Sequence, residues 1–159
     1  MINRYTRPRM SAIWDLQHKY EIWLEVELQA CAAFERGGQI PRGTSARIRK
    51  KAKIDVARIA DIEKVTKHDV IAFLESLMDS VGPEHRFLHM GLTSSDIVDT
   101  SLAVQMTEAL DLILEDLDEL IAVLKKRAIE HRHTVMVGRS HGIHGEPVSF
   151  GFKLAIWYE

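Results

Sequence analysis

Apolar positions recur at three- and four-residue steps along most of the chain, which predicts a protein built almost entirely from helices. The first helix is expected over about residues 9–36. Its apolar face consists of Leu16, Tyr20, Trp23, Leu24, Leu28, Cys31 and Phe34. Gly37 and Gly38 should end this helix, and Pro41 prevents its continuation.

Three shorter helices are expected next, over about residues 44–53, 55–65 and 69–81. The first of them is basic and is expected to present a solvated face. The polar segment 66–69 interrupts the apolar pattern and contains good capping residues. Residues 82–92, which begin with Gly-Pro, are expected to form a loop.

The longest helix is expected from Thr93 to about residue 132. Thr93 and Asp96 have the spacing of a capping box, with Asp in place of the usual Glu. Its seam, at steps of three and four, is typical of a helix packed lengthwise in a bundle: Leu102, Met106, Leu110, Ile113, Leu117, Leu120 and Leu124. At roughly 55–60 Å it exceeds the width of a compact domain of this size. We therefore expect more chain or other subunits to cover it.

The C-terminal part lacks a helical pattern until about Phe150. Glycines and a proline between Gly138 and Pro147 predict a loop, and only residues 134–137 alternate as a strand would, too few to found a sheet. The fold class is therefore predicted as all-α. A helical N-terminal domain over 1–92 would be followed by the first long helix of a central helical bundle over 93–159. We expect this bundle to be truncated, because the last apolar pattern reaches Glu159 without a stop signal.

Composition limits the function classes. Of 159 residues, 46% are hydrophobic and 28% charged, which is ordinary for a globular protein. The net charge of -2 argues against a nucleic-acid partner. Cys31, the single cysteine, is expected to be a buried thiol. The sequence has no apolar stretch that predicts a membrane span or a signal peptide, so we expect a cytoplasmic protein without a membrane partner.

Reactive side chains gather in three non-helical segments. These are Lys67–Asp69, His85–Asp96 and Arg139–Glu146, and the arm with Arg4 and Tyr5 is a candidate fourth. Each segment adjoins the end of an expected helix, so folding can bring them together, and loops on rigid scaffolds often carry chemistry.

Two kinds of chemistry find little support. His141 and His144 have a spacing that zinc sites use, but no third ligand or cysteine pair accompanies them. Ser140 adjoins His141, yet sequence neighbours rarely have triad geometry, and no Gly-x-Ser-x-Gly elbow is present.

General acid–base catalysis on an anionic substrate fits the residues better. Histidine is suited to proton transfer near neutral pH, and four histidines are expected in loops: His68, His89, His141 and His144. The helix start at Thr93-Ser94 offers backbone N–H groups and hydroxyls to a carboxylate or phosphate. Arginines such as Arg86 and Arg139 could add bidentate contacts. The alternative, that Thr93 and Ser94 only cap a helix and the histidines are structural, stays open here.

Four segments together resemble the adenylosuccinate lyase family of the fumarase/aspartase superfamily. They are Arg4-Tyr5-Thr-Arg-Pro, Thr66-Lys-His-Asp-Val70, Gly91-Leu-Thr-Ser-Ser-Asp-Ile-Val-Asp-Thr100 and Gly138-Arg-Ser-His-Gly-Ile-His-Gly-Glu-Pro147. The resemblance runs in order along the whole chain. Ser140 and Gly145 depart mildly from the commoner threonine and alanine of the family.

The resemblance implies an elimination that releases fumarate from adenylosuccinate and from the succinylated aminoimidazole carboxamide ribotide of purine biosynthesis. His141 matches the general acid, and His68 matches a histidine that assists it. His89 matches a histidine linked to the nucleotide phosphate. The other matched substrate-binding positions are Arg4, Tyr5, Lys67, Asp69, Thr93 and Ser94. No metal or organic cofactor is implied.

The resemblance also implies a homotetramer and a catalytic serine on a mobile loop, expected beyond Glu159, so we expect the 159-residue chain to be inactive alone. Two alternatives remain at this stage. One is another lyase or a cycloisomerase of the same superfamily, and the other is a non-catalytic helical interaction module.

Overall fold

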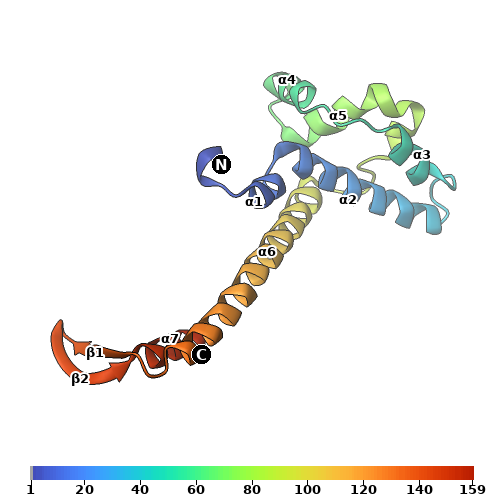
Figure 1. The fold of residues 1–159 in the computed structure, drawn as a ribbon. Coiled ribbons are helices and arrows are strands. Elements are labelled where there is room, and N and C mark those ends of the chain that lie inside the picture. Colours follow the sequence, from blue (N-terminus) through green and yellow to red (C-terminus); the bar gives the residue numbers. More distant parts are fainter. Residues whose placement is uncertain (1) are drawn as a thin grey trace. The chain divides into compact units, whose positions relative to one another are not determined.

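Helices form most of the regular structure in the computed structural model, which describes residues 2–159 (Figure 1). This confirms the mainly helical fold expected from the apolar periodicity. The chain divides into two compact units, Met1–Ala109 and Leu110–Glu159. The division falls inside the longest helix, later than the boundary at 92/93 that the sequence indicated, because the first part of that helix packs within the first unit.

The first unit begins with the short 3-10 helix η1 (Asn3–Tyr5), followed by α1 (Pro8–Ile13) and α2 (Leu16–Arg36). The single helix expected over 9–36 is therefore wrong, since the chain breaks at Trp14 and Asp15. The Asp15 carboxylate accepts a hydrogen bond from the Gln17 backbone N–H at 2.8 Å and so caps a new helix.

Three helices follow within about two residues of their expected bounds: α3 (Thr44–Lys51), α4 (Val56–Thr66) and α5 (Asp69–Val81). The loop expected over 82–92 instead begins with the 3-10 helix η2 (Gly82–Phe87), which has Pro83 in its first turn. The long helix α6 (Ser94–Glu130) confirms the expected long helix.

An aromatic cluster forms the centre of the first unit. The Trp23 ring meets Phe73 edge-on with centroids 5.5 Å apart, and Tyr20 stacks on Phe73 at 5.8 Å. Burying each such side chain is worth about 1.5–3 kcal/mol. The Trp23 Nε1–H donates to Ser101 Oγ at 2.8 Å, which ties the first part of α6 to α2.

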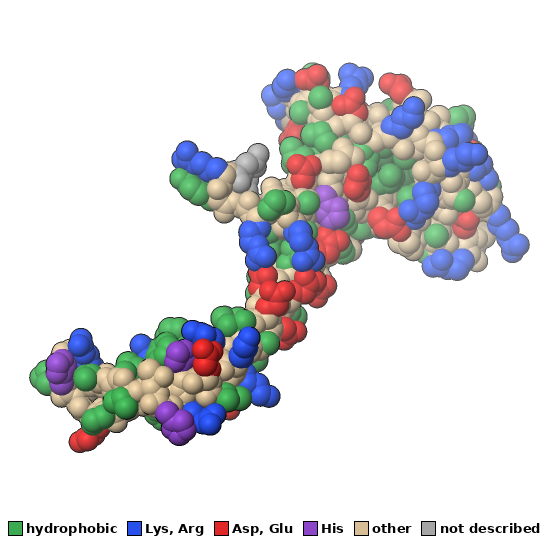
Figure 2. Space-filling model, in the orientation of Figure 1, with side chains coloured by type: hydrophobic (Ala, Val, Ile, Leu, Met, Phe, Trp, Pro, Cys, Tyr) green, Lys and Arg blue, Asp and Glu red, His purple; other side chains and the backbone are tan. Residues whose placement is uncertain are grey.

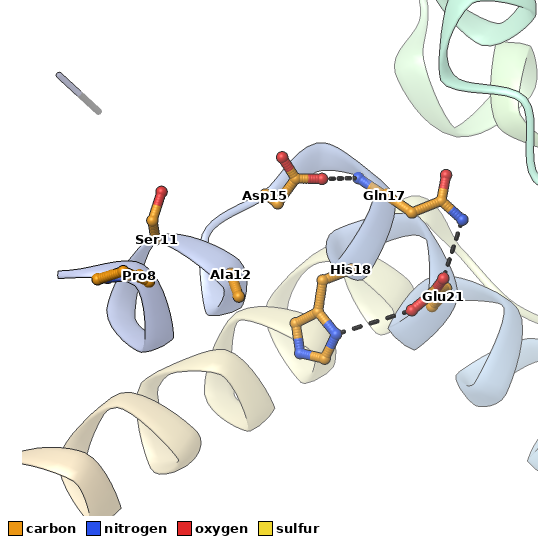
Figure 3. A pocket seen from close by; sticks show the side chains of 7 residues that line it. All are labelled: Pro8, Ser11, Ala12, Asp15, Gln17, His18 and Glu21. Carbon is orange, nitrogen blue, oxygen red and sulfur yellow. Dashed lines mark hydrogen bonds and ion pairs between the residues drawn. The ribbon is translucent and has the colours of Figure 1, made fainter. Parts of the chain in front are cut away.

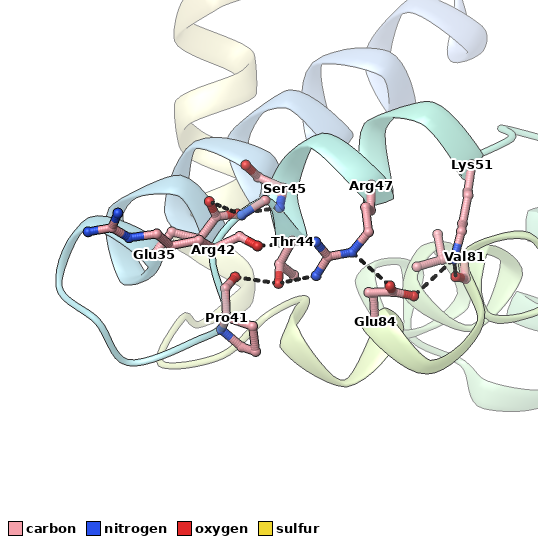
Figure 4. Close-up of polar contacts among 10 residues, drawn as sticks. Glu35, Pro41, Arg42, Thr44, Ser45, Arg47, Lys51, Val81 and Glu84 are labelled. Atoms are coloured by element: carbon pink, nitrogen blue, oxygen red, sulfur yellow. Dashed lines mark hydrogen bonds and ion pairs between the residues drawn. The ribbon is translucent and has the colours of Figure 1, made fainter.

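Carboxylates hold the basic helix α3 in place (Figure 4). Glu35, at the end of α2, accepts hydrogen bonds from the backbone N–H groups of Gly43 and Ser45. The Glu84 carboxylate of η2 forms ion pairs with Lys51 Nζ at 3.1 Å and with Arg47 Nε at 3.0 Å. These two cations lower the pKa of Glu84 to about 2. The basic face is therefore partly paired rather than wholly solvated.

The second unit contains a β-hairpin of β1 (Val135–Ser140) and β2 (Ile143–Ser149), followed by α7 (Phe150–Tyr158). The loop expected at 138–147 is wrong, as is the expectation that residues 134–137 could found no sheet. The strands pair antiparallel from Val135↔Ser149 to Ser140↔Ile143, with an irregularity between Val137 and Arg139.

Helix α7 approaches the end of α6 closely. A Cβ at Gly151 would lie 2.3 Å from the Ala128 carbonyl oxygen and 2.7 Å from Arg132 Cα, so this position admits only glycine. The His131 ring lies 5.1 Å from the Phe150 ring at the same junction. Within residues 2–159, no helix combines the length and apolar character that a membrane crossing requires.

Candidate functional site

His68 and Ser94, which are 26 residues apart in sequence, meet in the first unit. His68 caps α5, because its Nδ1 accepts a hydrogen bond from the Ile71 backbone N–H at 3.4 Å. This bond assigns the proton of the neutral ring to Nε2. Nε2 lies 3.4 Å from Ser94 Oγ, the first residue of α6. The fold thus places a proton-bearing nitrogen beside the N-terminus of a long helix.

Lys67 and Asp69 flank His68 in the turn between α4 and α5. Lys67 ends α4 in the left-handed conformation, with φ 54°. The Asp69 Oδ1 accepts a hydrogen bond from the backbone N–H of the next residue, Val70, at 2.7 Å. The same oxygen lies 3.6 Å from His68 Nδ1. His68 and Asp69 are each about two-fifths exposed, so both remain accessible to a ligand.

The start of α6 carries part of the expected capping box. The Thr93 backbone N–H donates to Asp96 Oδ2 at 2.8 Å, and the Asp96 N–H bonds back to the Thr93 carbonyl at 3.0 Å. A helix N-terminus attracts anions through its dipole and its free N–H groups. Thr93, Ser94 and His68 therefore combine features that suit a carboxylate.

His89 is held by a buried carboxylate. Glu27 of α2 is fully buried, with 0% exposed. Its Oε1 lies 2.7 Å from His89 Nδ1, and its Oε2 accepts the His89 backbone N–H at 2.6 Å. His89 itself has a φ of 58°, an uncommon conformation for a residue with a side chain.

Arg4 and Tyr5 lie in η1 at the exposed N-terminal arm. Tyr5 is 74% exposed, and the Arg4 guanidinium lies 4.7 Å from the centre of its ring. Within the described residues, these two side chains form a cation–π pair that is open to solvent.

His141 occupies the turn of the hairpin in the second unit. His141 and Gly142 both have positive φ, 51° and 75°, as a two-residue type I′ turn requires. The His141 side chain is exposed at this tip. Behind it, the Arg139 guanidinium lies 3.4 Å from His144 Nε2 across the strands. The hairpin thus presents an imidazole on a short, hydrogen-bonded support.

The sequence prediction did not identify Glu27. A usable signal was present, since Glu27 falls between Trp23 and Cys31 on the apolar face of α2, one turn from each. A charged residue on a buried face requires a partner, because an unpaired buried charge is strongly unfavourable.

An open hollow between α1 and α2 is lined by none of the residues that were predicted for the site. Figure 3 shows its lining, which is formed by Pro8, Ser11, Ala12, Asp15, Gln17, His18 and Glu21. His18, one of these lining residues, also places its Nε2 2.6 Å from the Glu108 carboxylate of α6. Among residues 2–159, no three His, Cys, Asp or Glu side chains form a group that could hold a metal ion.

Comparison with known proteins gives consistent matches. Residues 3–159 match the family described as lyase. An adenylosuccinate lyase of Bacillus subtilis (strain 168) is 47% identical over 159 residues, which are 100% of this chain and 37% of that protein. The adenylosuccinate lyase of Synechocystis sp. is 52% identical over 157 residues, 99% of this chain and 36% of that protein. The chain therefore spans little more than a third of the length of these relatives.

Solved structures show the same fold at lower identity. A fumarate lyase from Mesorhizobium sp. BNC1 superposes with a TM-score of 0.87 at 30% identity, covering 94% of this chain and 36% of that one. A 3-carboxy-cis,cis-muconate lactonizing enzyme from Pseudomonas putida also gives 0.87 at 30% identity, with 95% and 36% covered.

Proposed function

We propose that this chain, which belongs to the lyase family, is the N-terminal part of an adenylosuccinate lyase. The likeness to adenylosuccinate lyases over the whole chain carries this proposal. It agrees with the four motif segments from which the sequence resemblance was first drawn. The complete protein would release fumarate from adenylosuccinate and from the succinylated aminoimidazole carboxamide ribotide.

The proposed reaction is an elimination in which His141 is the acid. A base removes the proton from the carbon next to a carboxylate, and the electron pair forms the double bond of fumarate. The C–N bond breaks at the adjacent carbon, and the departing nitrogen keeps that electron pair and takes a proton from His141. The exposed position of His141 on the hairpin turn supports this role. The base is a residue outside this chain, so we expect the 159-residue chain to be inactive alone.

His68, Thr93 and Ser94 would bind the succinyl part of the substrate. The His68 Nε2–H and the α6 N-terminus both favour anionic oxygens, which gain charge as the carbon is deprotonated. Lys67 and Asp69 flank this position. Arg4, Tyr5 and His89 would contact the nucleotide. His68 would also assist the proton transfer from His141.

We further propose that the complete protein is a cytoplasmic homotetramer that needs neither a metal nor an organic cofactor. The exposed apolar residues of α6 and α7 support assembly, since large apolar surfaces are rarely left open to water. Adenylosuccinate would be the ligand, with no nucleic-acid or membrane partner.

Substrate identity tests the proposal. The complete protein should convert adenylosuccinate to AMP and fumarate, detected by mass spectrometry, and should leave 3-carboxymuconate unchanged. The Pseudomonas putida neighbour favours lactonization as the second candidate. Lactonization without fumarate release would replace the proposed function with that of this neighbour.

A non-catalytic helical module makes a different prediction. In that case His68→Ala and His141→Ala would alter assembly, measured by sedimentation, without any effect on turnover. Loss of turnover in variants that keep the assembly of the unaltered protein would exclude this module.

A further inference from the structure

The segment before α6 is attached to α2 by two side chains one helical turn apart. Cys31 Sγ donates to the Phe87 carbonyl at 3.2 Å, and Glu27 contacts both the backbone and the ring of His89. Residues 27 and 31 share one face of a helix. Helix α2 therefore fixes the position of residues 87–89, five residues ahead of the α6 N-terminus.

Glu27 has an unusual combination of burial and charge. It is 0% exposed, yet each of its two oxygens has a partner on the same residue, His89. A buried carboxylate is tolerated when it is paired and hydrogen-bonded. Because a carboxylate can only accept, the 2.7 Å contact places a proton on His89 Nδ1. Nε2 is then the ring nitrogen left to meet a ligand.

We propose that Glu27 is a positioning residue, which orients His89 so that its Nε2 binds the phosphate of the nucleotide substrate. This inference rests on the proposed function for the identity of the ligand. Glu27 also holds the His89 backbone at positive φ through the bond to Oε2. With its Nδ1–H held by Glu27, the ring is fixed in orientation, and a proton on Nε2 would be donated to an anionic oxygen of the ligand, as in other histidines oriented by a carboxylate.

Glu35→Gln is the matched control for Glu27→Gln. Glu35 lies on the same helix, and its carboxylate also accepts two backbone N–H groups, those of Gly43 and Ser45. Among the described residues, the hydrogen bonds of Glu35 go to this loop and not to His89. Loosening of a loop held by a carboxylate is therefore common to both variants, whereas loss of the ring contact is specific to Glu27→Gln.

The ring contact is tested in the 159-residue chain by ¹⁵N NMR of labelled histidines, with His89 assigned from His89→Gln. The ring signals of His89 should show a protonated, hydrogen-bonded Nδ1 and should shift in Glu27→Gln but not in Glu35→Gln. Unchanged His89 signals in Glu27→Gln would overturn the inference, whatever the enzyme does.

The positioning role is tested by kinetics of the complete protein with adenylosuccinate. Glu27→Gln should raise KM about 10- to 100-fold, as expected for loss of a hydrogen bond to a charged group, and change kcat by less than about threefold. The double variant with His89→Gln should be no worse than His89→Gln alone. Additive effects of the two substitutions would overturn the positioning role. If the unaltered protein released no fumarate, the proposed function would be overturned instead. The NMR experiment would still test the contact between Glu27 and the His89 ring, because it does not depend on activity.

Discussion

The ring of His68 has a different partner on each nitrogen. Nδ1 accepts from the Ile71 N–H, and Nε2 faces Ser94. The sequence indicated that the segments around residues 67–69 and 93–94 could meet, and the fold brings His68 Nε2 to 3.4 Å from Ser94 Oγ. The catalytic and binding roles of these residues stay predictions.

Residue patterns could not reveal the partner of His89. Glu27 and His89 are 62 residues apart, and only the packing of α2 against the segment before α6 joins them. The sequence shows that a carboxylate interrupts an apolar face, but it does not show which distant side chain compensates the charge. Long-range polar pairs of this kind depend on tertiary structure.

Cys31 gives a prediction about reactivity. Burial raises the pKa of this thiol from 9.0 to about 11, assisted by Glu27 and Glu35. Since the thiolate is the reactive form, Cys31 should react at pH 8 at least about 100-fold more slowly than free cysteine. Labelling with a disulfide reagent, with and without denaturant, measures this directly because no other cysteine is present.

The same shift has a consequence for stability. The thiol is favoured in the folded state, so its contribution is complete below pH 9 and is lost as the pH rises through about 11. In the labelling experiment, a reaction of Cys31 in the folded chain that is as fast as that of free cysteine would contradict the burial of this thiol.

Glu84 gives a prediction about acid sensitivity. Its pKa falls from 4.5 to about 2 beside Lys51 and Arg47, so its stabilising contribution is complete above pH 4.5 and is lost as the pH falls through about 2. Glu84→Gln should lower the Tm at pH 7, and the difference from the unaltered chain should disappear near pH 2.

Asp61→Asn is the control for this experiment. Asp61 pairs with Lys64 one turn away on the exposed face of α4, and such surface pairs contribute little. An equal loss of Tm in both variants at pH 7 would show that Glu84 has no special role in joining α3 to η2.

At the scale of elements, helices were predicted well and the hairpin was not. Helix α5 begins and ends where its apolar spacing and Gly82 indicate. In the hairpin, glycines and Pro147 disturb the alternation that marks a strand, and the ladder is irregular between Val137 and Arg139. The positive φ of His141 and Gly142 closes the turn, although histidine gives only a weak signal for that conformation.

The junction of α6 and α7 gives a prediction at this scale. Gly151→Ala would place a methyl group against the Ala128 carbonyl and the Arg132 backbone, neither of which can move aside easily. We expect a loss of about 1–3 kcal/mol in the free energy of unfolding, as for other overpacked positions. Urea denaturation of the chain measures this.

Gly145→Ala is the comparison for that substitution, because its nearest contact would be the Gly138 carbonyl at 3.5 Å, an ordinary van der Waals distance. It should cost less than Gly151→Ala. Equal stability of the Gly151→Ala variant and the unaltered chain would contradict the close approach of α7 to α6.

At the scale of the whole molecule, the second unit leaves much apolar surface open. Hydrophobic side chains are visible on it in Figure 2, and each of the following is at least 44% exposed: Leu110, Ile113, Leu114, Leu117, Leu120, Val123 and Ile129. The heptad-like seam predicted a partner for this face, and within the second unit these seven side chains are exposed, whereas Leu124 of the seam is buried.

This surface predicts self-association of the chain. Contiguous apolar area favours burial, at about 25 cal/mol per Å². Sedimentation equilibrium at 10–100 µM (about the range where modest interfaces associate) should give a weight-average mass of at least twice that of one chain. The double variant Leu117→Lys with Leu120→Lys should have a lower weight-average mass, because it places charges on the apolar face. The control double variant, Asp118→Lys with Glu119→Lys, should keep the mass of the unaltered chain. A strictly monomeric chain at 100 µM would contradict the prediction.

The turnover number of the complete protein with His141→Ala decides whether this chain supplies the acid of a lyase. We expect kcat for adenylosuccinate to fall by about 10²- to 10⁴-fold, the usual contribution of a general acid. The Kd for adenylosuccinate should change by less than about threefold, because His141 would act on the departing nitrogen rather than hold the substrate. An unchanged kcat in this variant would contradict the assignment of His141 as the proton donor.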